Sequence, residues 1–83
     1  MTKQDKLLEQ ARNNPASLRF SDFEALLAGS GWILRRQRSS HRLWYSPQGY
    51  RLPIQDENGQ AKPYQVRQFL TVYRSENPST TPP

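Results

Sequence analysis

The sequence predicts a small α+β domain in which two helices cover one face of a three-stranded antiparallel sheet. Three short runs of aromatic and β-branched residues, at 32–37, 41–45 and 50–54, follow one another with polar turns between them. Helical patterns flank these runs at 22–29 and from Pro63 onward. With 83 residues, of which 34% are hydrophobic, the chain has room for one modest core.

An additional helix is expected before this pattern, from Lys3 to Asn13. Its thin apolar stripe consists of three residues at helical spacing, Leu7, Leu8 and Ala11. The Asn-Asn-Pro sequence that begins at Asn13 then ends the helix. Residues 1–18 are therefore predicted to form a helical extension and a linker, either ordered against the main domain or frayed.

The second helix begins with the sequence Ser-Asp-Phe-Glu, which is typical of a capping box. Ser21 is predicted to cap the helix, and Glu24 to reach back to it from three residues later. Gly29 and Gly31 supply the backbone freedom at which a helix ends. These features predict a helix over residues 22–29.

Turns and one proline set the limits of the three predicted strands. The polar residues 38–40 separate the first two strands, and the Ser-Pro-Gln-Gly sequence at 46–49 suits a type I turn before the third. Pro53 cannot donate to a strand ladder, so the third strand is expected to lie at a sheet edge or to end early. Trp32 and Leu34 are predicted core residues.

The last helix is predicted from Pro63, a residue suited to a first helical turn. A polar loop is expected before it, over residues 55–61. One face of the helix repeats at i, i+3, i+4 and i+7 and is predicted to enter the core: Val66, Phe69, Leu70 and Tyr73. Residues 75–83 are rich in Pro, Ser and Thr and predict a disordered tail, which leaves residues 19–74 as the main domain.

Positive charge is concentrated in the middle third of the chain. The sequence has 12 Lys and Arg against 7 Asp and Glu, a formal net charge of +5. Residues 25–55 hold five arginines and no acidic residue, and the basic and acidic residues elsewhere balance. Such a localised basic surface attracts polyanions, including nucleic acids.

Composition disfavours several classes of protein. Cysteine is absent, and a single histidine with scattered carboxylates predicts no metal site and no other cofactor. No apolar run is long enough to span a bilayer, and no basic helix carries large apolar anchors, so no membrane partner is expected. The polar N-terminus has no features of a signal peptide, and the cytoplasm is the expected location.

The single histidine, His41, lies within the run from Arg35 to Arg42. Four arginines share that run: Arg35, Arg36, Arg38 and Arg42. Guanidinium groups attract phosphates, and imidazole can transfer a proton near neutral pH. The run predicts either a phosphate-binding patch with a catalytic group at its centre, as in a small ribonuclease, or a solvated hairpin whose histidine has no role.

Two segments resemble the HicA family of toxins, which are the RNA-cleaving halves of bacterial and archaeal toxin–antitoxin pairs. These segments are Arg36 to His41, which an aromatic strand follows, and Ala61 to Leu70. The resemblance covers roughly residues 19–74. It implies a double-stranded-RNA-binding-domain-like α-β-β-β-α fold, together with the extra N-terminal helix found in a longer subset of the family.

The family motif at the strand turn is Gly-Ser-His, in which the histidine is catalytic. Ser40 and His41 match this motif, whereas Ser39 stands where glycine is usual. The resemblance implies a metal-independent endoribonuclease that cleaves mRNA with His41 as catalytic base, and a HicB-like antitoxin protein as its partner. Ser40 either orients the histidine or shapes the turn. If position 39 requires a positive φ, its serine costs stability.

RNA binding is expected to depend on cations near the scissile phosphate. Without a metal, the RNA's own 2′-hydroxyl would be the nucleophile, and the four arginines around His41 would stabilise charge on the phosphate. Lys62, near the start of the last helix, and Arg67 are further predicted RNA-binding residues, although Lys62 is equally an ordinary surface lysine. Trp44 and Tyr45 face opposite sides of their strand, so one is predicted in the core and the other to stack on a base or on a partner protein.

Two alternatives belong to other functional classes. A basic α-β-β-β-α domain can hold duplex RNA by its shape without cutting it, as a non-catalytic module of double-stranded-RNA-binding-domain type. Such modules usually carry a lysine cluster at the start of the last helix, where this chain has only Lys62. A pure protein-interaction domain would leave the segregated charge unexplained.

Overall fold

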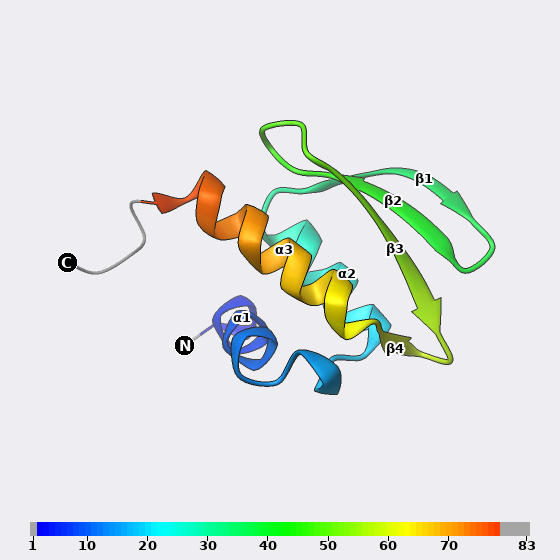
Figure 1. Ribbon diagram of the computed structural model, residues 1–83, viewed down its shortest axis with the longest axis horizontal. Coiled ribbons are helices and arrows are strands. Elements are labelled where there is room, and N and C mark those ends of the chain that lie inside the picture. The colour runs from blue at the N-terminus through cyan, green and yellow to red at the C-terminus, as the bar shows by residue number, and fades with distance from the viewer. Residues whose placement is uncertain (1, 79–83) are drawn as a thin grey trace.

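The computed structural model describes residues 2–78 and confirms the α+β class. The fold has three α-helices and a four-stranded antiparallel sheet with strand order β1-β2-β3-β4 (Figure 1). The elements, in chain order, are α1 (Lys3–Asn13), a short 3-10 helix η1 (Pro15–Ser17), α2 (Phe20–Gly29), β1 (Ile33–Arg38), β2 (His41–Tyr45), β3 (Arg51–Glu57), β4 (Gln60–Ala61) and α3 (Pro63–Glu76). None of the helices within residues 2–78 is long and apolar enough to cross a membrane.

The core lies between the sheet and helices α2 and α3, which cover the same face of the sheet (Figure 1). The Phe69 ring is central, with its centroid 6.0 Å from that of Phe23 and 5.4 Å from that of Trp32. The sheet contributes the buried side chains of Trp44, Leu52 and Ile54. No helix of residues 2–78 covers the opposite face of the sheet, so the side chains there are available to a ligand.

Helix α1 is ordered against the rest of the domain, and its predicted limits are confirmed. Leu7 and Ala11 belong to the same buried cluster as the residues of α2 and α3. The Gln4 side chain donates to the carbonyl of Leu26 at 3.2 Å and to the Ser30 hydroxyl at 2.9 Å. The N-terminal extension is therefore part of the core rather than a frayed segment.

The capping box predicted at Ser21 is wrong. Helix α2 begins at Phe20, so Ser21 lies inside the helix, and the N-cap residue Arg19 makes no side-chain cap. Tertiary contacts fix the start of the helix instead, because the backbone N–H of Phe20 donates to the carbonyl of Gly59 at 2.9 Å. The side chain of Phe20 is also buried. A capping box is present in the chain, but it lies at Thr2 and starts α1.

The predicted polar loop at 55–61 is also wrong, because it forms a second hairpin. Strand β3 continues to Glu57 and returns as β4, which adds a fourth strand to the three that were predicted. Asn58 and Gly59 form the turn with φ of 55° and 84°. A two-residue turn with positive φ at both positions favours the Asn-Gly sequence, so this pair was the available sequence signal.

Pro53 faces an open edge of the sheet, as predicted, but the strand does not end there. Strand β4 pairs only with Asp56 and Glu57, so the earlier part of β3 has a neighbour on one side only. The Gln55 N–H on this open side donates to the buried Gln65 side chain at 3.0 Å. Pro53 precedes Gln55 by two residues and therefore faces the same side, where its missing N–H costs no ladder bond.

Most predicted core residues are buried, and the exceptions lie at the margins. Trp32, Trp44, Val66 and Phe69 are buried, and Val72 joins them without having been predicted. Two others, Leu70 and Tyr73, are partly buried. Leu34 was predicted in the core, but it is 37% exposed because it lies on the edge strand β1.

Helix α3 extends further than the sequence indicated. Ser75 and Glu76, which were assigned to the tail, form its last turn, and the Ser46 hydroxyl donates to the Glu76 carboxylate at 2.5 Å. Asn77, also assigned to the tail, is the C-cap residue, and its side-chain amide donates to the carbonyl of Tyr73 at 2.9 Å. Residues 79–83 of the predicted disordered tail lie outside the described residues.

The Ser39-Ser40 turn adopts the strained conformation anticipated for a serine in place of glycine. Ser39 has φ of 54°, while Arg38 and His41 on either side of the turn pair with each other. A left-handed conformation costs about 1–2 kcal/mol for a residue with a Cβ atom. Replacement with glycine relieves this strain, but glycine's greater loss of backbone entropy offsets about 0.5–1 kcal/mol of the gain.

Ser39→Gly is therefore expected to stabilise the protein by about 0.5–1 kcal/mol and to raise its Tm by about 2–8 °C. Thermal unfolding followed by circular dichroism measures the change. Ser40→Gly is the matched control and should lower Tm, since Ser40 has no positive φ for glycine to relieve. A Ser39→Gly protein that unfolds below the wild type would contradict this account of the turn.

Candidate functional site

A β-bulge in β1 determines which side chains reach the open face of the sheet. Leu34 pairs with Trp44, and Arg36 pairs with Leu43, so Arg35 is an extra residue between them. A one-residue bulge reverses the alternation of side chains along a strand. Leu34, before the bulge, therefore shares the core face with its partner Trp44, whereas Arg36, two positions later, shares the opposite face with Leu43.

The bulge places two arginines beside His41. Arg38 is the direct cross-strand partner of His41, and Arg36 is the partner of Leu43. If β1 alternated regularly from the buried Trp32, positions 36 and 38 would face the helices instead. Arg36 and Arg38 instead share the open face with His41.

The open face carries a cleft of about 200 Å³ on β1, β2 and β3. Its lining residues are Arg36, Arg38, His41, Arg42, Leu43, Arg51 and Pro53. Leu43 and Pro53 are cross-strand partners and provide an apolar floor. Arg51 was not predicted as a site residue, because it comes from a separate strand and only sheet pairing brings it here. The sequence did contain a signal for Arg51. It alternates with the apolar residues Leu52 and Ile54, which are both buried, and this alternation indicates that Arg51 faces away from the core.

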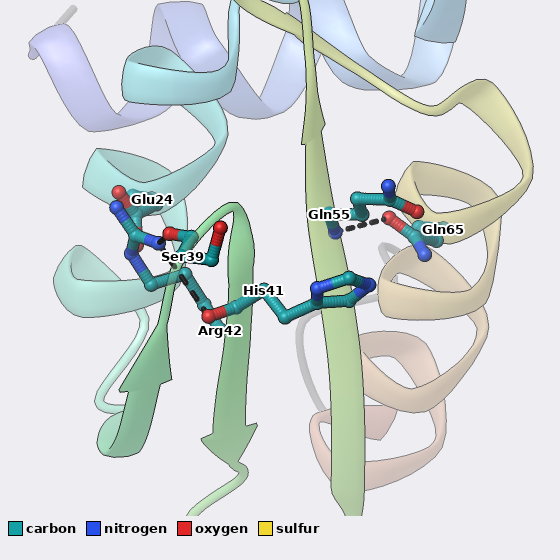
Figure 2. A network of polar contacts seen from close by, with 6 residues as sticks. All are labelled: Glu24, Ser39, His41, Arg42, Gln55 and Gln65. Atoms are coloured by element: carbon teal, nitrogen blue, oxygen red, sulfur yellow. Dashed lines mark hydrogen bonds and ion pairs between the residues drawn. The ribbon is translucent and has the colours of Figure 1, made fainter.

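The imidazole of His41 is exposed and has no partner among residues 2–78, where no hydrogen bond or ion pair involves it. Figure 2 shows its ring extending from β2 in front of β3, toward the position of its cross-strand partner Gln55. An imidazole that bonds to nothing else keeps its ring nitrogens available for a substrate proton.

Arg42 borders the same cleft, but its guanidinium is turned toward the helices. Its Nε atom lies 3.6 Å from the Glu24 carboxylate, and its Nη1 atom donates to the carbonyl of Ser39 at 2.7 Å (Figure 2). The Arg42 side chain is only 17% exposed, and its guanidinium carbon lies 5.6 Å from the centroid of the Phe20 ring. Arg42 thus ties the hairpin to α2 and leaves phosphate binding to the other arginines.

The remaining predicted site residues lie around the cleft rather than in it. The carbonyl of Ser40 accepts the N–H of Asp56 at 2.9 Å, but no hydrogen bond joins its hydroxyl to His41 within the described chain. Lys62 precedes α3, with its Nζ atom 3.4 Å from the Glu57 carboxylate. Arg67 is exposed on α3. From the predicted set, the structure therefore brings together His41, Arg36 and Arg38, with Arg42 at the border of the cleft, and it adds Arg51.

The described lining residues of the cleft include the His41 imidazole and four arginines, of which Arg42 is engaged with Glu24, and they include no carboxylate. Such a set suits a phosphate group and one proton transfer. No group of three or more His, Cys, Asp or Glu side chains within residues 2–78 is arranged to hold a metal ion. Comparison of the chain with protein-family models, with curated proteins and with solved structures gave no significant match.

Proposed function

We propose that this chain is a metal-independent endoribonuclease that cleaves mRNA, and that it acts as the toxin of a HicA-type toxin–antitoxin pair. One observation carries the proposal: an imidazole without a partner among residues 2–78 shares a cleft with Arg36, Arg38 and Arg51. His41, the histidine of the Ser-His sequence that resembles the HicA motif, lines this cleft, and Ser40 precedes it in the turn. General acid–base chemistry at a phosphate needs a proton acceptor within reach of fixed positive charge.

In the proposed mechanism, neutral His41 takes the proton of a ribose 2′-hydroxyl. The 2′-oxygen then attacks the adjacent phosphorus, and the bond from phosphorus to the 5′-oxygen of the next nucleotide breaks. Water returns a proton to the leaving oxygen, so the products are a 2′,3′-cyclic phosphate and a free 5′-hydroxyl. Arg36, Arg38 and Arg51 stabilise the extra negative charge on the phosphate during attack. Ser40 and Arg42 contribute by fixing the turn that carries His41.

The proposal extends to the fold and the partner. The order of elements from α2 to α3 supports a double-stranded-RNA-binding-domain-like arrangement, in which β4 is a short addition and α1 an extra helix. A HicB-like antitoxin with an acidic surface would complement the arginine-rich face and cover His41. The non-catalytic RNA-binding module remains the alternative, because it would use the same positive charge.

The purified chain is expected to cut a single-stranded mRNA in the presence of excess chelator. Gel electrophoresis of a labelled transcript measures the fragments, and a preparation heated to unfold the protein is the control for contaminating nucleases. The fragments should appear at a rate proportional to enzyme concentration, because each cut needs only the protein and its substrate. Retention of intact RNA at every enzyme concentration would favour the non-catalytic module instead.

A further inference from the structure

A second set of exposed side chains continues the open face beyond the cleft. Tyr45 is half-buried on this face, and its cross-strand partners are Ile33 on β1 and Arg51 on β3. Ile33 is 58% exposed. Ile33, Tyr45 and Arg51 thus form one row across the three strands, called the Tyr45 row below. Arg51 also lines the cleft that contains His41, so the cleft and the Tyr45 row share this arginine.

The Tyr45 ring already carries a planar group on one face. The guanidinium carbon of Arg35 lies 5.8 Å from the ring centroid. Arg35 is the extra residue of the β-bulge and is exposed, so its long side chain has room to move. Guanidinium groups and nucleic-acid bases both stack on aromatic rings and on each other.

The charge around the Tyr45 row indicates which kind of ligand it would bind. The three strand segments that form the open face, at 33–38, 41–45 and 51–55, contain no acidic residue. They carry four arginines whose positions face away from the core or lie at the bulge: Arg35, Arg36, Arg38 and Arg51. An aromatic ring among cations is the combination that proteins use to bind single-stranded nucleic acid.

We propose that Tyr45 and Arg35 form a stacking subsite for one unpaired base of the RNA, next to the phosphate-binding cleft. This inference rests on the proposed function. The base replaces the Arg35 guanidinium on the Tyr45 ring, and Arg35 then covers the other face of the base. Strand geometry places Tyr45 about 14 Å along β2 from His41, so the stacked base lies within a few nucleotides of the scissile phosphate. Because a paired base in a duplex is already stacked on its neighbours, the subsite selects single strands.

Binding of a fluorescent single-stranded RNA to the full chain tests the subsite, with His41→Ala present in every variant so that nothing is cut. Tyr45→Ala should weaken binding about tenfold to a hundredfold, as the loss of one stacked base does. Tyr45→Phe keeps the ring and should stay within about twofold of the parent. Tyr50→Ala is the matched control, because Tyr50 is 39% exposed but bonds to Gln68 on the helix side.

Two further measurements separate stacking from charge. Tyr45→Ala should leave the salt dependence of binding unchanged, whereas Arg36→Ala should reduce its slope by about one unit. Moving a single abasic nucleotide along the RNA should reveal one position at which Tyr45→Ala no longer matters. A duplex of the same sequence should bind the Tyr45→Ala variant and its parent equally.

Different failures have different meanings. If Arg36→Ala lowers the salt slope but Tyr45→Ala and Tyr45→Phe bind alike, the subsite is overturned and the proposed function stands. If Tyr45→Ala changes only the affinity for an acidic protein partner, the ring belongs to a protein interface and the subsite is again overturned. If the parent does not bind RNA at all, both the subsite and the proposed function are wrong.

Discussion

Replacing His41 with alanine is expected to abolish RNA cleavage while leaving the fold and the affinity for RNA intact. His41 is the only imidazole in the chain, and a positioned general base contributes about 10²–10⁴-fold to rate. The side chain is exposed and bonds to no described residue, so its removal should change stability by no more than about 0.5 kcal/mol. Cells that express the wild type should stop growing, whereas cells that express His41→Ala should grow normally.

The matched control is Gln55→Ala. Gln55 is the cross-strand partner of His41, but its side chain does not line the cleft. Its hydrogen bond to Gln65 uses the backbone N–H and survives the substitution. This variant should therefore cut RNA and arrest growth like the wild type. Equal toxicity of the wild type and His41→Ala at matched expression would remove His41 from the chemistry.

A substrate with 2′-deoxyribose at the cut position is expected to bind but to resist cleavage at that position. The proposed nucleophile is the 2′-hydroxyl itself, so its removal leaves no attacking group. Affinity should fall only slightly, because arginines recognise the phosphate and not the sugar. Cleavage of matched all-RNA and single-deoxy oligonucleotides in excess chelator measures the difference.

The ends of the fragments provide an independent check on the same mechanism. Mass spectrometry of the all-RNA digest should find a 2′,3′-cyclic phosphate, or its hydrolysis product, on the 5′ fragment and a free hydroxyl on the 3′ fragment. A 5′-phosphate on the 3′ fragment would indicate attack by water. Comparable cutting of the deoxy and ribose substrates would likewise exclude the role proposed for His41, even if the protein is a nuclease.

Local patterns in the sequence were sufficient to predict those helices and strands whose limits depend only on the spacing of their own apolar residues and on nearby helix-start residues. Helix α1, strand β2 and the start of α3 lie where the spacing of apolar residues and Pro63 predicted them. The start of α2 was mispredicted because a backbone bond from Phe20 to Gly59 overrides the local preference of Ser21 for a cap. Such a bond joins residues far apart in sequence, and no window along the chain contains it.

The candidate site likewise contains residues that the local sequence predicted and residues that only contacts between distant segments bring into place. His41, Arg36 and Arg38 were predicted together because they lie within one short run, although the bulge that aligns them was not foreseen. Arg51 was missed because it enters the cleft through pairing of β3 with β2. Arg42 was predicted to bind phosphate because nothing near it in the sequence indicates its ion pair with Glu24. Glu24 lies on a separate helix, α2, and only the fold brings the two together. A count of charges shows where cations are concentrated, but the alternation of each strand decides which of them face the ligand.

The two long edges of the sheet resist unwanted strand addition by different means. On β3, Pro53 has no N–H to offer and the N–H of Gln55 is already bonded to Gln65, so an incoming strand finds few donors. On β1, the edge is blunted by the bulge at Arg35 and by positive charge. Protection by occupied or missing donors does not depend on ionic strength, whereas repulsion between charged edges weakens as salt screens it. Edge-to-edge self-association through β3 should therefore be opposed at any salt concentration. Self-association through β1, the strand that also carries part of the cleft, should be opposed less strongly as the salt concentration rises.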